Sequence, residues 1–254
     1  MLRPRIIPCL LVEQKGLVKT RRFREPRYVG DPLNAVRIFN EKEVDEIMVL
    51  DISATRLGTA PNYRLIQNIA AECRMPLCYG GGVKAADEAV KIIGLGVEKV
   101  ALGASAVLRP ALISEIAREV GNQSVVVVVD VKSDGRGGWS VYTYNGTRAS
   151  GCSVADVVEQ AEALGAGEVV VNSIDRDGMM KGYDLELARH VRSRITVPMT
   201  VLGGAGSLVD LKTLINEFGV VGAAAGSLFV FNGPYRAVLI TYPKRAARSE
   251  LYAR

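Results

Sequence analysis

The sequence predicts an α/β protein with a (β/α)8 barrel, or TIM barrel, fold. Short β-branched runs recur along the chain, and each is followed by a loop and a helix-like segment. The length of 254 residues suits one such barrel. An internal repeat supports it, because "MPLCYGGGVKAAD" (75–87) resembles "VPMTVLGGAGSLVD" (197–210). We therefore expect one domain over residues 1–254, built from two half-barrels at about 1–122 and 123–254.

Eight apolar runs are expected to form the barrel strands. Runs such as "VVVVV" are apolar at every position, which is typical of parallel strands that are buried on both faces. The runs lie near residues 5–12, 46–51, 75–80, 98–103, 124–131, 167–173, 198–203 and 221–226.

The segments between these runs have helical periodicity, and several carry start or stop signals. Proline stands near a first turn in Asp31-Pro32 and in Arg109-Pro110, and Gly121 and Gly165 fit helix ends. Helices are expected near residues 31–43, 61–74, 84–95, 110–120, 153–165, 184–193 and 207–218, with a weak last one after Asn232.

Two connections are long, and both follow strands that the repeat relates. Residues 13–30 follow the first strand and are expected to be a loop, and residues 132–152 follow the fifth. The second connection contains "GGWSVYTYNGT", which predicts a small hairpin with an Asn145-Gly146 turn. Loops that follow the strands form the active face of this fold, so both connections are expected beside the active site.

Composition and charge exclude several functional classes. No apolar run reaches the roughly 18 residues of a membrane span, and the N-terminus does not resemble a signal peptide, so we expect a cytoplasmic protein without membrane contact. The net charge is +5, with basic clusters at 19–27 and 243–254. These clusters lack the aromatic interleaving of a nucleic-acid interface. They favour a solvated loop, or attraction for an anionic substrate, over nucleic-acid binding.

The cysteines and the single histidine argue against metal and thiol chemistry. The cysteines are Cys9, Cys73, Cys78 and Cys152, and their spacing does not fit a zinc site or a disulfide framework. We expect buried free thiols, no metal and no cofactor. His190 follows a helical pattern, which argues against a catalytic histidine base.

Glycine-rich turns are the first candidates for a binding site. "YGGGVK" contributes Gly81 and Gly82, "LGGAGS" contributes Gly203 and Gly204, and "AAGSLF" contributes Gly226 with Ser227. Each turn closes a strand and opens a helix, where backbone N–H groups can bind an anion. Loops after strands 7 and 8 are the usual phosphate site of such barrels. The alternative is that these glycines only allow tight turns.

Three aspartates lie at or just after strand ends and are candidates for acid–base chemistry. Asp51 ends "IMVLD", Asp130 ends "VVVVVD", and Asp177 lies in "SIDRDG". Burial at a barrel mouth would raise the pKa of a carboxyl group toward acid–base use. The alternative is that each aspartate caps a loop or pairs with a cation such as Lys19.

Several motifs together resemble one known family. "RIIPCL", "GDP", "VLDI", "YGGGVK", "SIDRDG", "GYD" and "LGGAG" occur in the order and spacing of the cyclase subunit of imidazole glycerol phosphate synthase. The resemblance implies a barrel of histidine biosynthesis that receives ammonia from a glutaminase subunit docked at the strand-start end. It also implies a bisphosphorylated substrate and an acid–base pair of aspartates on strands 1 and 5.

The active face departs from the pattern that the resemblance implies. The strand 5 aspartate matches Asp130, but the strand 1 aspartate falls on Leu11, which cannot exchange a proton. The family's polar pair after strand 4 falls on Gly103 and Ala104, and its serine before the strand 7 glycines falls on Leu202. The other phosphate pocket retains its family residues: Gly178, Gly203, Gly204, Gly226 and Ser227.

The strand-start end, in contrast, matches the family completely. The resemblance implies a ring of two basic and two acidic residues that gates ammonia entry, and its members fall on Arg5, Glu46, Lys99 and Glu168. Four alternating charges can form a closed ring of salt bridges, whereas one unpaired buried charge would be costly. The alternative is a ring that merely plugs the barrel.

These matches and departures favour a cyclase-like subunit of a glutamine-dependent amidotransferase complex. "IPCLLV" and "KTRRF" resemble paralogues associated with surface-polysaccharide genes, which implies that ammonia is used by a third protein to amidinate an acetamido sugar. The expected partners are a glutaminase subunit, a phosphorylated small molecule or anion, and that third protein. One alternative is a working cyclase of histidine biosynthesis, and another is a non-catalytic scaffold.

Overall fold

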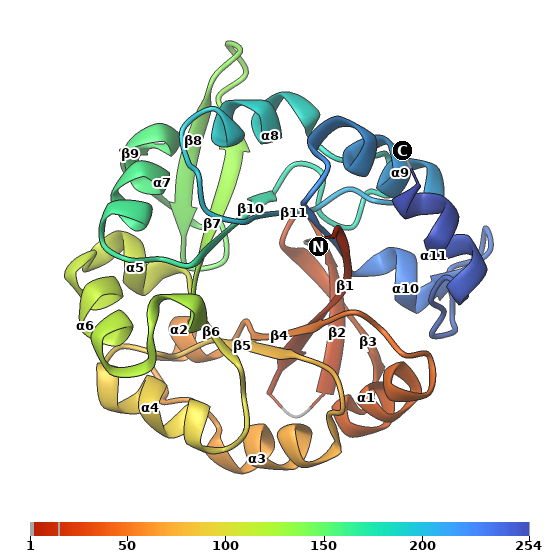
Figure 1. Cartoon of the computed structure of the whole chain (residues 1–254), viewed down its shortest axis with the longest axis horizontal. Helices are drawn as coiled ribbons and strands as arrows, with labels where there is room; N and C mark the ends of the chain where they lie inside the picture. The colour runs from red at the N-terminus through yellow and green to blue at the C-terminus, as the bar shows by residue number, and fades with distance from the viewer. Residues whose placement is uncertain (1–2, 15, 254) are drawn as a thin grey trace.

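A computed structural model describes residues 3–14 and 16–253 (Figure 1). Within them, eight parallel strands close into a barrel with helices around it, which confirms the predicted fold class. Going round the barrel, the strands are β1 (Arg5–Glu13), β4 (Ile47–Asp51), β5 (Leu77–Gly80), β6 (Lys99–Leu102), β7 (Val125–Ser133), β10 (Glu168–Ser173), β11 (Met199–Leu202) and β12 (Gly222–Ala225). β12 pairs with β1 to complete the circle.

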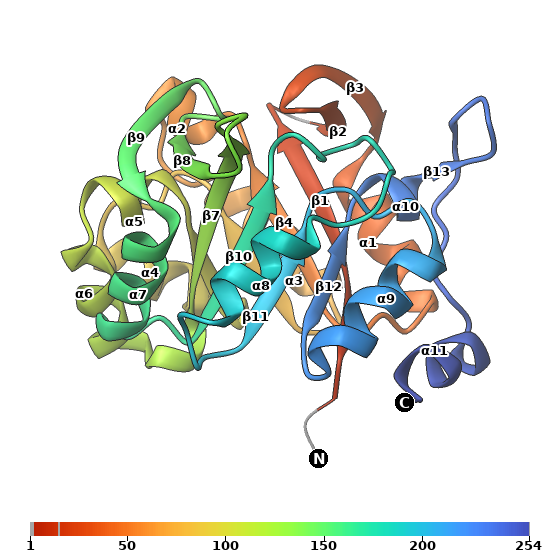
Figure 2. The same cartoon turned by 90° about the horizontal axis from the view of Figure 1, so that it is seen from above.

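A ring of helices covers the outside of the barrel (Figures 1 and 2). Asp31 caps the first helix, because its carboxylate accepts from the backbone N–H of Asn34 at 2.9 Å and Pro32 follows at the first position. The longer helices are α1 (Pro32–Glu41), α3 (Tyr63–Glu72), α4 (Ala86–Gly94), α6 (Ala111–Val120), α7 (Val154–Ala163), α8 (Leu185–Arg192), α9 (Leu208–Phe218) and α11 (Arg245–Tyr252). Short helices α2 (Ala54–Leu57), α5 (Ala104–Leu108) and α10 (Ser227–Val230) follow strands β4, β6 and β12.

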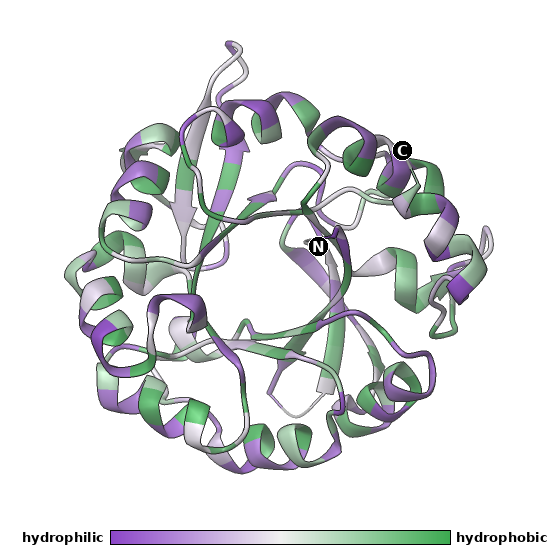
Figure 3. Cartoon of the chain, viewed as in Figure 1, coloured by the Kyte–Doolittle hydropathy of each residue, from purple (hydrophilic) through white to green (hydrophobic). Residues whose placement is uncertain are grey.

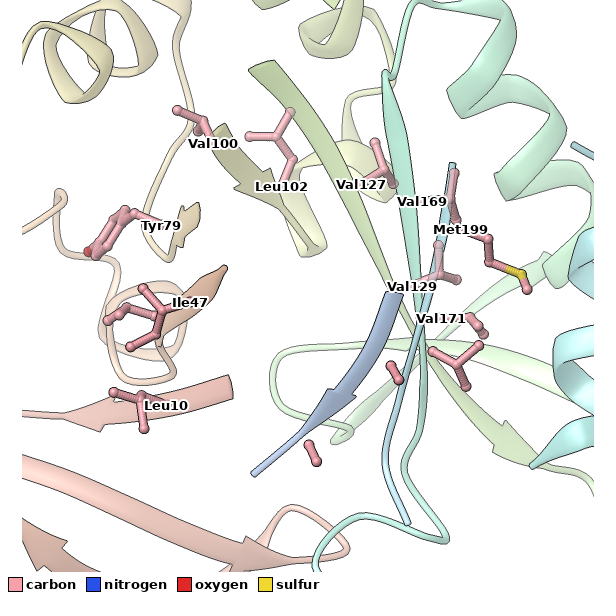
Figure 4. Packing of buried hydrophobic residues seen from close by; sticks show 14 of the residues in the cluster. Leu10, Ile47, Tyr79, Val100, Leu102, Val127, Val129, Val169, Val171 and Met199 are labelled. Carbon is pink, nitrogen blue, oxygen red and sulfur yellow. The ribbon is translucent and has the colours of Figure 1, made fainter. Parts of the chain in front are cut away.

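Alternation along each strand divides the core into two layers. One set of side chains points outward and packs against helices that carry both hydrophobic and hydrophilic residues (Figure 3). In Figure 4, Val127 and Val129 of β7 lie beside Val169 and Val171 of β10, in agreement with the strand register. The other set fills the barrel interior. On β7 this inward set ends with Asp130, so the strand itself fixes where that carboxyl group points.

Two antiparallel hairpins rise from the ends of opposite strands. β8 (Trp139–Thr143) and β9 (Arg148–Ser153) extend β7, and the turn between them contains Asn145 and Gly146 as predicted. The expectation of a loop over 13–30 is wrong, because β2 (Gly16–Arg21) and β3 (Arg24–Gly30) form a hairpin on β1. β1 runs on to Glu13 and so offers an edge for this pairing.

The C-terminal segment contains the last expected helix and two short strands. The helix, expected after Asn232, begins at Arg245, and the strands β13 (Phe231–Asn232) and β14 (Ala237–Val238) precede it. Pro234 and Pro243 lie in this intervening segment, where proline disfavours a continuous helix.

The four cysteines differ in their exposure to solvent. Cys9 and Cys78 are buried, but Cys73 is half-buried and Cys152 is exposed on β9, so the expectation of four buried thiols is wrong. Cys152 is exposed because β9 lies at the edge of the hairpin rather than in the barrel. His190 lies within α8 as expected, with its ring 5.4 Å from that of Trp139.

No helix in the described residues is long and apolar enough to cross a membrane.

Candidate active site at the mouth of the barrel

A cavity of about 140 Å³ opens at the end of the barrel where the strands terminate, here called the mouth. All the active-face residues expected from the sequence line it. They come from seven of the eight strand ends and from the β2 strand. They are Leu11, Lys19, Asp51, Gly81, Gly82, Asp130, Asp177, Gly178, Gly203, Gly204, Gly226 and Ser227.

Asp130 is held by the next strand along the barrel wall. Its Oδ1 accepts from Asn172 Nδ2 at 2.9 Å, because these residues are direct partners in the register of β7 and β10. Burial raises the pKa of Asp130 to about 7, the Asn172 hydrogen bond opposes the rise, and the charge of Asp177 adds to it. Asp130 can therefore gain or lose a proton near neutral pH, which is the requirement for a general acid or base.

Asp177 lies in the loop after β10 and is tied to the β2–β3 hairpin. Its Oδ2 accepts from Thr20 Oγ1 at 2.7 Å, and its backbone oxygen accepts from the N–H of Arg22 at 2.9 Å. Burial raises its pKa, although Thr20 and Lys19 favour the charged form. Two carboxyl groups with raised pKa values thus share one cavity.

Asp51 has a structural role that the sequence left open. Its Oδ1 accepts from the backbone N–H groups of Ser53 and Ala54, at 2.9 and 3.1 Å, and from Ser53 Oγ at 2.6 Å. These bonds cap the turn into α2. The capping interpretation therefore applies to Asp51, although the residue also lines the mouth.

Lys19 reaches into the mouth from β2 and is almost completely buried, with 5% of its surface exposed. Its ammonium group donates to the backbone oxygen of Cys9. Burial lowers the pKa of Lys19, although Cys9 and Asp177 favour the charged form. The ammonium also lies against Gly226, where a Cβ atom would come within 2.5 Å of Nζ. Any side chain at residue 226 would therefore displace it.

Leu11 lies across the mouth from Asp130, because β1 and β7 are four strands apart in both directions round the barrel. It belongs to the inward-facing set of β1 and packs with Leu50 on β4 in the interior cluster that also contains Leu202. The side chain that faces Asp130 from the end of β1 is consequently apolar, although the buried Lys19 ammonium binds β1 nearby at Cys9. Within the described residues, the one carboxyl group of β1 is Glu13, which lies two residues beyond Leu11, binds Arg56 at 2.9 Å and does not line the cavity.

The glycine turns bring backbone segments closer than a side chain would allow. A Cβ atom on Gly178 would lie 2.0 Å from the backbone oxygen of Thr20, and one on Gly204 would lie 2.2 Å from that of Gly182. The N–H groups of Gly206 and Ser207 are already bound by the Asp210 carboxylate, each at 2.9 Å. An anion at this turn would therefore have to use the N–H groups of earlier residues.

Sequence reasoning missed Asn172 and Thr20 as parts of the mouth, whereas the hairpin turn at Asn145 lines it as expected. Asn172 could have been found from the alternation of side chains along β10, because every second residue faces inward and Asn172 follows Glu168 and Val170 in that set. Thr20 could not, because its position depends on the unexpected hairpin. Asn145 Nδ2 donates to the backbone oxygen of Ile52 at 2.6 Å, which ties the β8–β9 turn to the end of β4.

The opposite end of the barrel holds the predicted charged ring of Arg5, Glu46, Lys99 and Glu168. Lys99 Nζ lies 2.9 Å from both Glu46 Oε1 and Glu168 Oε2. Arg5 binds Glu46, and its Nη2 lies 2.7 Å from Glu168 Oε1. Burial opposes the charge on Lys99, but the two carboxylates outweigh it and raise its pKa. The ring is therefore closed and charge-balanced.

An apolar interior separates the charged ring from the mouth. Its side chains are buried and belong to one cluster that lies inside the barrel. They include small residues such as Ala101 and Ala224 as well as larger ones such as Met48. The molecule is thus charged at one end and apolar in the middle, with Asp130, Asp177 and Lys19 at the mouth.

Comparisons with known proteins bear on this arrangement. A family model described as "Histidine biosynthesis protein" matches residues 5–235. A protein of Leptospira interrogans is 56% identical over 253 residues, covering 99% of this chain and all of the relative. A protein of Pseudomonas aeruginosa is 52% identical over 243 residues, covering 96% of this chain and 97% of the relative. The chain belongs to the HisF family.

The more similar relatives and a less similar one carry different names. The Leptospira and Pseudomonas proteins are named "Putative imidazole glycerol phosphate synthase subunit HisF" and "hisF2". A protein of Exiguobacterium sibiricum, 39% identical over 229 residues that cover 90% of this chain and 91% of the relative, is named without that qualifier. Membership of the HisF family agrees with the fold and with the imidazole glycerol phosphate synthase resemblance.

Proposed function

We propose that this HisF-family barrel is the ammonia-receiving subunit of a glutamine-dependent amidotransferase complex. The observation that carries the proposal is the contrast between the two ends of the barrel. The charged ring is complete and its four members bind one another, whereas the mouth has an apolar Leu11 opposite Asp130. In this proposal, a glutaminase partner docks at the ring, and the ring opens to admit ammonia.

The apolar interior suits ammonia better than ions or water. Ammonia is small and neutral, so it does not carry the desolvation cost that a charge would carry in this interior. The charged ring would exclude bulk ions at the entrance. Asp130 follows Val128 in the inward-facing set of β7, at the mouth end of the interior, and its pKa of about 7 allows it to exchange a proton there.

We further propose that the nitrogen acceptor is an acetamido sugar of a surface polysaccharide, amidinated by a third protein. The support is the resemblance of "IPCLLV" and "KTRRF" to paralogues of that kind. The glycine turns at Gly203, Gly204 and Gly226 would bind a phosphate group of a ligand at the mouth. In this proposal Asp130 and Asp177 exchange protons, and Leu11 prevents the paired chemistry of a full cyclase.

A working cyclase of histidine biosynthesis is the second candidate. It is favoured by the raised pKa values of Asp130 and Asp177 in one cavity, since the second carboxyl group could replace the absent strand 1 acid. A non-catalytic scaffold is the third candidate, in which the charged ring only plugs the barrel.

The experiment that separates the first two candidates is a cyclisation assay with free ammonium, which bypasses any partner. The amidotransferase proposal predicts turnover of the bisphosphorylated precursor about 10²–10⁴-fold below that of a HisF protein with both aspartates, because one positioned acid or base is absent. Equal turnover would instead establish the working cyclase.

A further inference from the structure

The β2–β3 hairpin places positive charges directly opposite one another. In its ladder Lys19 pairs with Arg27, and Arg21 pairs with Arg24. Like charges at opposed positions of an antiparallel pair destabilise it. Lys19 turns into the mouth and binds Cys9, but the three arginines are exposed. In the part of the chain that the structure describes, none of these arginines forms an ion pair with a carboxylate.

A further arginine from the C-terminal segment joins them. The Cζ atoms of Arg27 and Arg236 lie 5.3 and 5.6 Å from the ring centroid of Phe231, which is buried. Arg236 Nη2 also donates to the backbone oxygen of Gly178 at 2.7 Å. Burial lowers the pKa of Arg236, and the nearby charges of Arg21 and Arg27 lower it further. We call Arg21, Arg27 and Arg236 the arginine cluster. These three cations lie close together despite their mutual repulsion.

The arginine cluster borders its own hollow on the surface. Arg21 and Arg236 line a hollow of about 700 Å³, whose other walls include Met179, Phe231 and Pro234. It shares no lining residue with the mouth cavity. The two cavities are neighbours nonetheless, because Arg236 holds the backbone of Gly178, which lines the mouth.

We propose that the arginine cluster is a binding site for a phosphate group, separate from any phosphate site at the mouth. The planar guanidinium fork matches phosphate oxygens with two hydrogen bonds, and three cations suit a dianion better than a single carboxylate. Cation–π contacts with Phe231 favour the placement of two of the guanidinium groups beside one another before a ligand arrives. The organic part of a phosphate monoester would lie in the adjoining hollow, against Met179, Phe231 and Pro234.

The test is isothermal titration calorimetry of the whole chain with inorganic phosphate, glycerol phosphate and hexaglutamate at low ionic strength. The variant is Arg21→Gln/Arg27→Gln, which leaves Arg236 on Gly178. The matched control is Arg64→Gln/Arg118→Gln, which removes two exposed helix arginines that also form no ion pair in the described residues. Arg21→Gln alone serves if the double variant fails to fold.

The proposal predicts that the first variant loses one bound phosphate per chain, or binds it at least about tenfold more weakly, while the control is unchanged. A phosphate site at the mouth would stay intact in the arginine variant and in the control. Phosphate binding that remains in the arginine variant would therefore belong to the mouth. Glycerol phosphate should show the same dependence on Arg21 and Arg27. Phosphate binding that is equal in all the proteins would overturn the proposal. Arginine-dependent binding of hexaglutamate alone would also overturn it, because the cluster would then be a docking surface for an acidic protein.

Discussion

Asn172 Nδ2 donates a hydrogen bond of 2.9 Å to Asp130 Oδ1, while the other amide atom, Asn172 Oδ1, is buried and has no partner in the described residues. A buried acceptor without a donor is costly. Protonation of Asp130 provides one, since rotation of the Asn172 amide would let Oδ1 accept the carboxyl proton. The pair is therefore suited to both protonation states of Asp130, which agrees with a pKa of about 7.

The first prediction concerns this pair. Asn172→Leu should raise the pKa of Asp130 above about 7, because it removes the hydrogen bond that favours the carboxylate. The measurement is a carbon NMR titration of aspartate side chains. Thr20→Val is a useful comparison, because losing its bond to Asp177 favours neutral Asp177 and should move the Asp130 pKa downward. A lower Asp130 pKa in Asn172→Leu would contradict the assignment.

Asp130 should also make folding stability depend on pH. Its folded pKa is raised, so the native state binds its proton more tightly than the unfolded chain does between about pH 4 and 7. Stability should therefore fall as pH rises through this window. Asp130→Asn should remove that slope and increase stability at pH 8 by about 1–2 kcal/mol, discounted because the side chain is partly open to solvent. Denaturant unfolding at pH 5 and pH 8 measures both quantities, and an unchanged slope would refute the prediction.

The charged ring gives a third prediction. Lys99→Ala would leave Glu46 and Glu168 with one cation, and could cost roughly 3–5 kcal/mol of stability. Lys99→Arg keeps the charge and should largely preserve folding, although its planar head group changes the geometry. Thermal unfolding of both variants measures the difference. Equal stability of Lys99→Ala and the natural protein would mean that the ring is not a coupled network.

Leu11 provides the fourth prediction. Leu11→Asp should raise the pKa of Asp130, because a second carboxylate would then share the mouth. It should not restore full cyclisation with ammonium, because Gly103, Ala104 and Leu202 still lack the side-chain donors that the family pattern has. The measurement is turnover of the bisphosphorylated precursor by the variant and by the natural protein. Full activity in Leu11→Asp would show that Leu11 alone separates this chain from a cyclase.

The sequence predicted the barrel well because its signals are local and repeated. Apolar runs, Pro32 at a helix start and the turn at Gly146 each act over a few residues. The β2–β3 hairpin was missed because its strands carry Lys19, Arg21 and Arg27, and these charged residues interrupt the apolar pattern by which a strand is predicted. Its pairing depends on β1 continuing beyond the barrel, which no local pattern records.

The site was predictable in part for a similar reason. Leu11 and Asp130 both stand near the ends of barrel strands, at positions whose side chains face inward. The alternation of side chains along each strand is therefore enough to place them at the mouth. The bonds of Asn172 and Thr20 depend on register between segments far apart in the sequence, and that register appears only in the folded chain. The cap formed by Asp51 was indistinguishable in sequence from a catalytic carboxylate, since both stand at a strand end.

The most direct test of the central claim is to mix the natural protein with the glutaminase subunit of the same organism, and to measure complex formation and glutamine turnover. The account predicts a complex at micromolar concentration and a change in glutamine turnover on binding. Lys99→Arg should form the same complex but transfer nitrogen less efficiently per glutamine hydrolysed. If no complex forms and turnover is unchanged, the ammonia-receiving function is contradicted and the scaffold remains.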